Sequence, residues 1–348
     1  MVRLSVRPYR LLFKRPFGTA HGVRTGTDSV FVRLDQDGVF GYGEATMPPY
    51  VAENQRTVLD RLAVWSGLEL SLPGDLHKAL EQLSSWVTEA PSARAALSMA
   101  LIDLAGKLTG QPAWKLMGAP FPEPRPMMMT LGICDPNEVP SLLADLPAVN
   151  VLKVKLNGDE DLARLREVLQ HWRKALFLDV NQGWKTNAQA LEVLEFIDGS
   201  EVLGIEQPYH KDDTEKSAWL QSRTGFAVFA DESVQGPVDL GLRSAGFNGI
   251  NVKLQKCGGP DVALSMAKTV KNQGKQTMLG SMSESSLGCT AAAHLGGLAA
   301  LLDLDGPWLI QNDPFEGLGL QNGLSKLNDH PGFGARLLPE LGFDPIGA

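Results

Sequence analysis

The stretch "VLKVKLNG", residues 151–158, places two lysines in an apolar run that is typical of a buried strand. Side chains along a strand alternate between its two faces, so Lys153 and Lys155 share one face. Taken alone, this pair fits an edge strand whose charges prevent pairing with another chain. The stretch gains a different meaning because Lys155 begins a series of polar residues that end successive apolar strands.

Eight short apolar strands follow one another between residue 127 and about residue 320, and helical patterns fill most of the gaps. This repeat predicts a parallel (β/α)8-type barrel, and the slightly short length predicts that one of its helices is degenerate. Such barrels carry their active sites at the C-terminal ends of the strands. Strands two to eight end in polar residues, namely Lys155, Asp179, Glu206, Asp231, Lys253, Ser281 and Asp303.

The region before residue 120 has a different character. In "DSVFVRLDQDGVFGYGEA", Asp37 and Gly38 separate two alternating runs, which predicts a β-hairpin. Leucines at helical spacing in residues 92–110 predict a helix that Gly110 ends. We therefore expect a small α+β unit, followed by a linker in the proline-rich residues 119–126.

Composition narrows the classes of function. A length of 348 residues suggests one large domain and a smaller one. A net charge of −8 argues against nucleic acid as the main partner, and no apolar stretch is long enough to span a membrane. Three scattered cysteines and an N-terminus without a signal-peptide pattern favour a reducing compartment, so we expect a cytoplasmic protein.

Three carboxylates are predicted on neighbouring strands, at Asp179, Glu206 and Asp231. Mutual repulsion would push at least one of them toward protonation unless a cation lies between them. A set of oxygen ligands without histidine or cysteine argues against zinc and selects a hard ion, for which we expect Mg²⁺.

Two lysines are predicted to face each other across the barrel. Lys155 and Lys253 end strands that lie four apart in a ring of eight. A metal ion and two opposed amines suit removal of a proton from a carbon next to a carboxylate, with a proton returned to the opposite face. Lys153 would disfavour protonation of Lys155 as a neighbouring like charge, and it can also bind a substrate carboxylate.

Two aspartates in "LLDLDGP", Asp303 and Asp305, lie on the strand opposite Glu206. They could bind the ammonium group of a zwitterion whose carboxylate lies at the metal ion. This span calls for a molecule longer than an amino acid, and a dipeptide fits. The alternative interpretation is a simple Asp-Gly turn.

Several motifs occur in a characteristic order: "KVK", "LDVNQGW", "IEQP", "FADES", "INVKLQKCGG", "SMSES" and "DLDG". With them the chain resembles the enolase superfamily, in its muconate-lactonizing-enzyme-like subgroup, and specifically the dipeptide epimerases. The resemblance implies a (β/α)7β barrel with an N-terminal α+β capping domain. It also implies Mg²⁺ bound by Asp179, Glu206 and Asp231, and Lys155 and Lys253 as acid/base catalysts. The expected units are a cap over residues 1–122, a barrel over 123–320, and a segment over 321–348 that packs back on the cap.

The resemblance further implies that two cap loops supply specificity, here residues 18–27 and 46–53. Arg24 would bind an acidic side chain, as in similar epimerases acting on L-Ala-L/D-Glu, unless it is a solvated loop arginine. Tyr50 would contact substrate or serve packing. Thr130 and Ser281 match substrate-contacting positions on strands one and seven.

The expected activity is therefore epimerisation at the C-terminal residue of a dipeptide, L-Ala-L/D-Glu or a similar L-Xaa-Glu. The rivals of the same superfamily are an o-succinylbenzoate synthase and an N-acylamino acid racemase, whose substrates lack the ammonium that Asp303 and Asp305 would bind. A metal-independent lyase that forms a Schiff base on a lysine is a more remote alternative. The sequence does not specify the assembly, although a homo-oligomer is common for such barrels.

Overall fold

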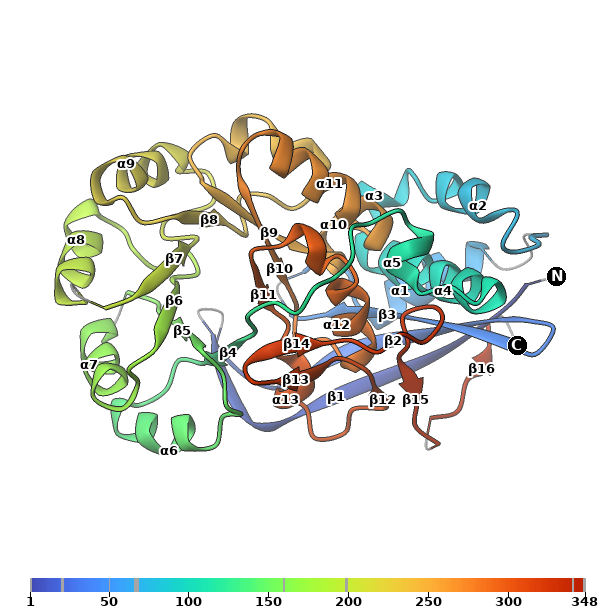
Figure 1. Cartoon of the computed structure of the whole chain (residues 1–348), viewed down its shortest axis with the longest axis horizontal. Coiled ribbons are helices and arrows are strands. Elements are labelled where there is room, and N and C mark those ends of the chain that lie inside the picture. The colour runs from blue at the N-terminus through green and yellow to red at the C-terminus, as the bar shows by residue number, and fades with distance from the viewer. Residues whose placement is uncertain are drawn as a thin grey trace.

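The computed structural model describes residues 2–19, 22–49, 51–65, 69–158, 160–197, 200–339 and 341–346. Figure 1 shows a barrel with helices around it on one side and an antiparallel sheet with its own helices on the other. No helix within these ranges is both long and apolar enough to cross a membrane.

The antiparallel sheet of the first part is built from three long strands in chain order. They are β1 (Arg3–Thr19), β2 (Gly22–Gln36) and β3 (Val39–Met47). Asp37 and Gly38 join β2 to β3 with φ angles of +54° and +81°. Two successive left-handed residues are what a two-residue hairpin turn requires, so the predicted hairpin is confirmed.

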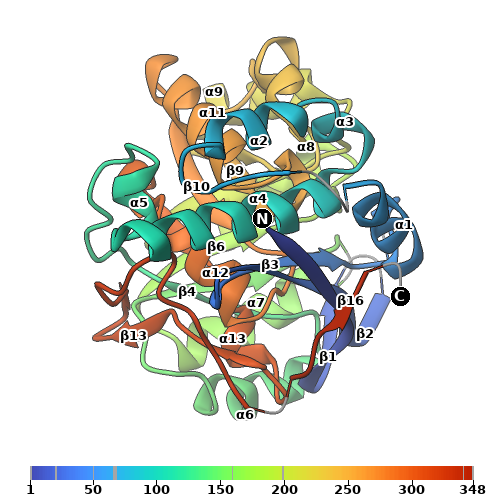
Figure 2. The ribbon, with the colours of Figure 1, turned by 90° about the vertical axis from the view of Figure 1, so that its right-hand side faces the viewer.

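Helix α4 (Pro91–Thr109) crosses this sheet, as Figure 2 shows. The helix approaches closely because glycines of β3 face it: a Cβ on Gly43 would lie 1.8 Å from the Ala96 carbonyl oxygen. The helix ends at Gly110, which adopts a left-handed conformation with φ of +67°, as the sequence predicts. The other cap helices are α1 (Gln55–Trp65), α2 (Leu76–Gln82), α3 (Trp86–Glu89) and α5 (Ala113–Leu116).

Helix α4 also joins the cap to the barrel. The Arg94 guanidinium, which is 3% exposed, donates to both carboxylate oxygens of Asp261 at 2.9 and 2.8 Å. It also donates to the carbonyls of Leu83 and Gly258 at 3.0 and 2.6 Å, and Ser98 Oγ donates to Asp261 at 2.7 Å. Cap and barrel therefore share a buried ion pair in which the donors and acceptors are matched.

The barrel consists of eight parallel strands whose spatial order follows the chain. A bridge between Met127 and Leu302 links the eighth strand to the residue before the first, which confirms the predicted barrel. Its strands are β4 (Met128–Leu131), β5 (Val151–Lys155), β6 (Ala175–Asp179), β7 (Val202–Glu206), β8 (Val228–Ala230), β9 (Gly249–Lys253), β10 (Gln276–Gly280) and β11 (Leu301–Asp303).

Helices cover the outside of the barrel in most of the connections. The connection from β8 to β9 instead holds the 3-10 turns η2 (Pro237–Leu240) and η3 (Leu242–Ser244), because Gly236, Pro237 and Gly241 interrupt a longer helix. The predicted degenerate helix therefore lies here. The other elements are η1 (Pro136–Glu138), α6 (Val139–Ala144), α7 (Asp161–His171), α8 (Asn187–Phe196), α9 (Thr214–Thr224), α10 (Leu254–Cys257), α11 (Pro260–Asn272), α12 (Ser286–Ala293), η4 (Gly296–Leu298) and α13 (Gly306–Leu309).

The last part of the chain returns to the N-terminal sheet. It forms the short strands β12 (Phe315–Glu316), β13 (Gly319–Gln321), β14 (Leu324–Lys326), β15 (Arg336–Leu337) and β16 (Asp344–Pro345). Strand β16 pairs antiparallel with β1, with Pro345 opposite Ser5. The N-terminal sheet thus has four strands in the order β16-β1-β2-β3.

Candidate functional site

A cavity of about 690 Å³ lies at the C-terminal ends of the barrel strands, under residues of the cap. Its lining contains most of the residues that the sequence selects: Arg24, Thr130, Lys153, Lys155, Asp231, Lys253, Ser281, Asp303 and Asp305. Asp179 and Glu206 lie deeper, at 1% and 0% exposure. The residues chosen from the ends of the strands therefore come together.

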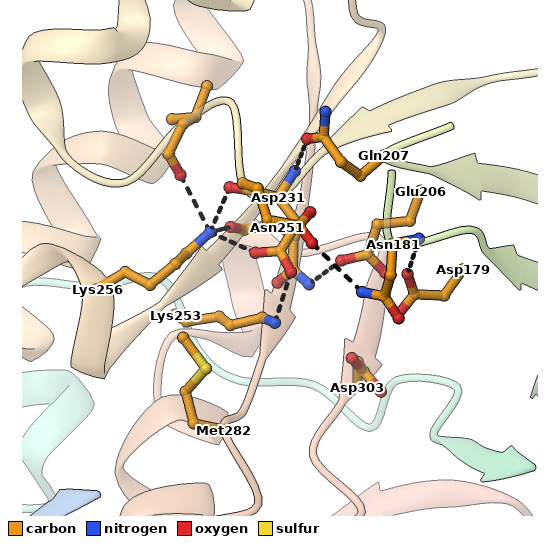
Figure 3. A network of polar contacts seen from close by, with 12 residues as sticks. Asp179, Asn181, Glu206, Gln207, Asp231, Asn251, Lys253, Lys256, Met282 and Asp303 are labelled. Carbon is orange, nitrogen blue, oxygen red and sulfur yellow. Dashed lines mark hydrogen bonds and ion pairs between the residues drawn. The ribbon is translucent and has the colours of Figure 1, made fainter. Parts of the chain in front are cut away.

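The three carboxylates follow from the register of the sheet. Asp179 and Glu206 are direct partners at the ends of β6 and β7. Asp231 comes directly after β8, which ends one residue earlier than predicted, at Ala230. Ser281 likewise follows β10 rather than ending it. Figure 3 shows the three acids gathered around Asn181 and Asn251.

The two predicted catalytic lysines contact the acid cluster at different members. Lys155 Nζ donates to Asp179 Oδ2 at 2.8 Å, and Lys253 Nζ donates to Asp231 Oδ2 at 2.8 Å. Their strands β5 and β9 are four positions apart in the eight-stranded ring. The amines thus approach from opposite sides of the barrel, with Glu206 on the strand midway between them.

Lys153 lies inside the acid cluster. Its Nζ is 2.6 Å from Glu206 Oε2, 2.7 Å from Asp303 Oδ2 and 3.0 Å from Asp179 Oδ2. Burial opposes its charge, but the three carboxylates outweigh burial and raise the pKa of Lys153 well above its usual value. Lys153 therefore links the acids of β6 and β7 to the aspartate of β11. Its predicted influence on Lys155 and on a substrate carboxylate stays a prediction.

The pKa values of the three carboxylates differ because their partners differ. Burial would raise the pKa of Asp179, but Lys153 and Lys155 lower it to about 2. Burial and the neighbouring Asp179 raise the pKa of Glu206 to about 7. Lys253 and Lys256 overcome burial and hold the pKa of Asp231 below its usual range. The lysine charges near Glu206 therefore do not offset its burial and the repulsion from Asp179.

The chemistry of these acids fits a hard divalent cation. They are buried oxygen donors, and an additional cation would relieve the repulsion that raises the pKa of Glu206. Among the described residues, no group of three or more histidine, cysteine, aspartate or glutamate side chains is arranged to hold a metal ion, and Asp179 and Asp231 pair with lysines. The lysines thus neutralise part of the negative charge of these acids, and a bound ion would neutralise more of it.

The sequence interpretation missed Lys256 and Asn251. Lys256 Nζ donates to Asp231 Oδ1 at 2.6 Å and to the carbonyls of Asp231, Val234 and Asn251 at 2.9 to 3.0 Å. Asn251 Nδ2 donates to Glu206 Oε1 at 2.6 Å. A signal was available, because Asn251 lies two residues before Lys253 on the same strand face, and Lys256 lies one helical turn after it.

Asp303 and Asp305 lie at the end of β11, close to β4. Asp303 Oδ2 accepts from Lys153, and Asp305 Oδ2 accepts from the Thr130 backbone N–H at 2.8 Å. Burial and the charge of Asp303 raise the pKa of Asp305 to about 6. Asp305 directly precedes α13, which begins at Gly306, and both aspartates line the cavity.

The specificity residues of the cap are only partly described. The loop predicted over residues 18–27 is mostly strand, because β1 runs to Thr19 and β2 starts at Gly22. Arg24 extends from β2 into the cavity lining, where Nη2 donates to Ser283 Oγ at 3.2 Å and Nη1 to Thr27 Oγ1 at 3.0 Å. Its guanidinium lies 5.3 Å from the centre of the Phe13 ring. Tyr50 lies outside the described residues.

Comparison with protein families finds two matches that divide the chain. Residues 2–118 match the mandelate racemase / muconate lactonizing enzyme N-terminal domain, and residues 143–341 match the enolase C-terminal domain-like family. The chain belongs to the mandelate racemase and muconate lactonizing enzyme family. The resemblance stated from its motifs is thereby confirmed, as is the barrel fold with an N-terminal α+β unit.

Members of this family with known names are similar over almost the whole chain. An L-Ala-D/L-Glu epimerase of Bacteroides thetaiotaomicron is 35% identical over 96% of this chain and 87% of its own length. A dipeptide epimerase of Enterococcus faecalis, solved with Mg and L-Leu-L-Tyr, has a TM-score of 0.86 at 26% identity over 96% of this chain and 98% of its own. An N-succinyl Arg/Lys racemase of Bacillus cereus has a TM-score of 0.87 at 27% identity over 97% and 95%. These relatives are epimerases or racemases, so the expected isomerase class is confirmed.

Proposed function

We propose that this family member is a Mg²⁺-dependent dipeptide epimerase that inverts the α-carbon of the C-terminal residue of L-Ala-L/D-Glu or a similar L-Xaa-Glu dipeptide. The observation that carries the proposal is the combination of opposed amines on β5 and β9 with the aspartate pair at the end of β11. Relatives named dipeptide epimerases, at 31–35% identity, support the same reaction class.

Asp179, Glu206 and Asp231 would hold the metal ion. Bound there, Mg²⁺ would supply positive charge opposite the substrate carboxylate, where negative charge grows as the α-proton leaves. The chain's own contribution is to keep Asp231 ionised through Lys256 and to orient Glu206 through Asn251.

Lys155 and Lys253 would act as the two acid/base catalysts. One neutral amine removes the α-proton, and the other, as an ammonium, delivers a proton to the opposite face of the planar intermediate. The roles exchange for the opposite epimer. Glu206 lies on β7, between Asp179 of β6 and Asp231 of β8, so a carboxylate bound near these acids would place its α-carbon between the amines.

Asp303 and Asp305 would bind the ammonium group of the N-terminal residue. Both are buried acids in the cavity lining, on the strand opposite Glu206. Arg24 lines the same cavity from the cap and would bind the side-chain carboxylate of a C-terminal glutamate. An N-acylated substrate has no ammonium for the aspartates, which favours a dipeptide over the substrate of an N-acylamino acid racemase or an o-succinylbenzoate synthase.

The decisive experiment follows deuterium from D2O into L-Ala-L-Glu and L-Ala-D-Glu in the presence of Mg²⁺, with mass spectrometry to locate the label. We expect label at the C-terminal α-carbon and interconversion of the two epimers. Lys155→Ala should abolish interconversion while exchange persists in the one epimer whose α-proton faces Lys253. Equal exchange into both epimers in that variant would contradict two opposed bases.

A second test separates the rivals. Asp303→Asn with Asp305→Asn should abolish turnover of dipeptides, while an N-succinylated amino acid would be unaffected as a substrate. Unchanged dipeptide turnover in the double variant would favour the racemase or the synthase. Full activity in excess EDTA, together with borohydride trapping of substrate on Lys155 or Lys253, would instead support the Schiff-base alternative.

A further inference from the structure

A second, smaller cavity adjoins the site beside the aspartate pair. It has a volume of about 160 Å³ and shares Phe17, Thr130 and Leu309 with the large cavity. Thr130 also donates its backbone N–H to Asp305 at 2.8 Å. The small cavity therefore starts at the wall next to the proposed ammonium site.

This cavity, which we name the β4 pocket, has a mainly apolar lining. Two cations, Lys14 and Arg15, are part of the lining, but both side chains are exposed and Arg15 pairs with Asp145. The apolar wall comes from β1, the end of β4 and the residues that follow it, the region of α6, and α13; it includes Phe17, Leu131, Ile133, Leu142, Trp308 and Leu309.

The β4 pocket is formed by a close contact between cap and barrel. The Ile133 backbone N–H donates to the Gly18 carbonyl at 3.0 Å, and a Cβ on Gly18 would lie 2.0 Å from the Ile133 carbonyl oxygen. The backbones of β1 and of the segment after β4 therefore touch, and both segments contribute to the lining of the pocket.

We infer that the β4 pocket binds the side chain of the N-terminal residue of the dipeptide and selects an apolar side chain larger than the methyl group of alanine. The inference rests on the proposed function. An ammonium bound by Asp303 and Asp305 would place the first α-carbon beside Thr130, and its side chain would point toward the residues that the two cavities share.

The chemistry of the lining determines the preference. An alanine methyl leaves most of this apolar space unfilled, whereas leucine or methionine fills it, and each methylene in such a pocket changes kcat/KM by about 10-fold or more. A lysine side chain would lose its hydration without gaining a counter-charge from the apolar wall. The pocket thus favours leucine and methionine over alanine, and alanine over serine and lysine.

The test is a panel of L-Xaa-L-Glu dipeptides, with Xaa as Ala, Leu, Met, Ser or Lys, assayed by deuterium incorporation with Mg²⁺. We expect kcat/KM for Leu and Met at least 10-fold above Ala. Exchange that is as fast with Ala or Lys as with Leu would overturn this inference alone. No exchange with any member of the panel would overturn the proposed function and this inference with it.

Two variants that fill the β4 pocket test directly whether this pocket sets the preference for the N-terminal residue. Ile133→Phe and Leu146→Phe approach it from different segments, and each should reduce the ratio of kcat/KM for L-Leu-L-Glu to that for L-Ala-L-Glu by at least 10-fold. Leu191→Phe, a matched change on the outer surface of α8, should keep the wild-type ratio. Thermal unfolding followed by circular dichroism identifies the variants that fold. An unchanged ratio in a folded pocket variant would contradict the assignment.

Discussion

Two buried charge networks of this molecule have opposite designs. At the junction of cap and barrel, the Arg94 guanidinium donates to one carboxylate and two carbonyls. At the barrel mouth, Asp179, Glu206 and Asp303 share the single ammonium of Lys153, and the pKa of Glu206 rises to about 7. A matched network stabilises the fold, whereas an unmatched one keeps groups ready for a ligand or a proton.

The largest expected effect is a loss of activity on replacement of a lysine at the barrel mouth, and it would sharpen the contrast between the two networks. Lys253→Ala should lower kcat/KM for dipeptides by about 10³-fold, because it removes one acid/base group. The midpoint of thermal unfolding should stay near that of the wild type, because Lys256 still pairs with Asp231. Lys268→Ala, an exposed lysine on α11, is the control for general loss of charge. Wild-type turnover in Lys253→Ala, together with a lowered midpoint of unfolding, would reverse the assignment of the two networks.

The next effect concerns the junction. Arg94→Met should lower the free energy of unfolding by roughly 3–4 kcal/mol, because Asp261 loses its partner in a largely buried position. Urea unfolding measures this change. Replacing Arg94 and Asp261 together with apolar residues should recover much of the loss, since no unpaired charge then remains. If the double variant is as unstable as the single one, Arg94 and Asp261 stabilise the fold by more than the pairing of their charges.

His294 is a buried ionisable group outside both networks, and its pKa shows how burial disfavours a charge. Its Nδ1 accepts from the Trp114 backbone N–H at 3.1 Å, and its Nε2 lies 3.0 Å from the Phe333 carbonyl. Burial lowers its pKa to about 4, against the effect of the Phe333 carbonyl. The unfolded chain therefore binds a proton at higher pH than the folded chain does. Stability should fall by roughly 3 kcal/mol as the pH falls from about 6.5 to 4.

The measurement is urea unfolding across this pH range for the wild type and His294→Gln. The difference between the two proteins isolates the histidine from the carboxylates that titrate in the same range. We expect the wild type to lose stability relative to the variant as the pH falls. Parallel pH dependences would show that folding does not lower the pKa of His294.

The smallest predicted effect is on specificity. Arg24→Met should reduce the preference for L-Ala-L-Glu over L-Ala-L-Gln by about 10-fold, the size of one charge-assisted hydrogen bond. The ratio of kcat/KM values is the readout, because a general loss of activity leaves it unchanged. A ratio that does not move would assign Arg24 to its contacts with Thr27 and Ser283 alone.

The strands and the site could be predicted because both depend on a local sequence pattern of short apolar runs that end in a polar residue. Apolar runs of about five residues that end in Lys155, Asp179, Glu206 or Lys253 specify the strand, its end and the face of the barrel together. The degenerate helix was expected, although its place was not, because the breakers Gly236 and Gly241 are also common in ordinary loops.

What could not be predicted depends on contacts between distant segments. Arg94 and Asp261 lie 167 residues apart, and Arg24 and Ser283 lie 259 apart, so no local pattern connects them. The position of Lys153 among three carboxylates depends on strands closing into a ring, so no local pattern predicts these ion pairs. The domain boundaries stay a prediction.

The pairing of β16 with β1 has a consequence for synthesis in the cell. Residues 344–345 form the outer strand beside Ser5 and Val6, so this part of β1 acquires its outer neighbour only after all the residues between them have been synthesised. Until then the edge of β1 is open to pairing with another nascent chain, and the delay makes this edge a site where misassembly during translation can begin.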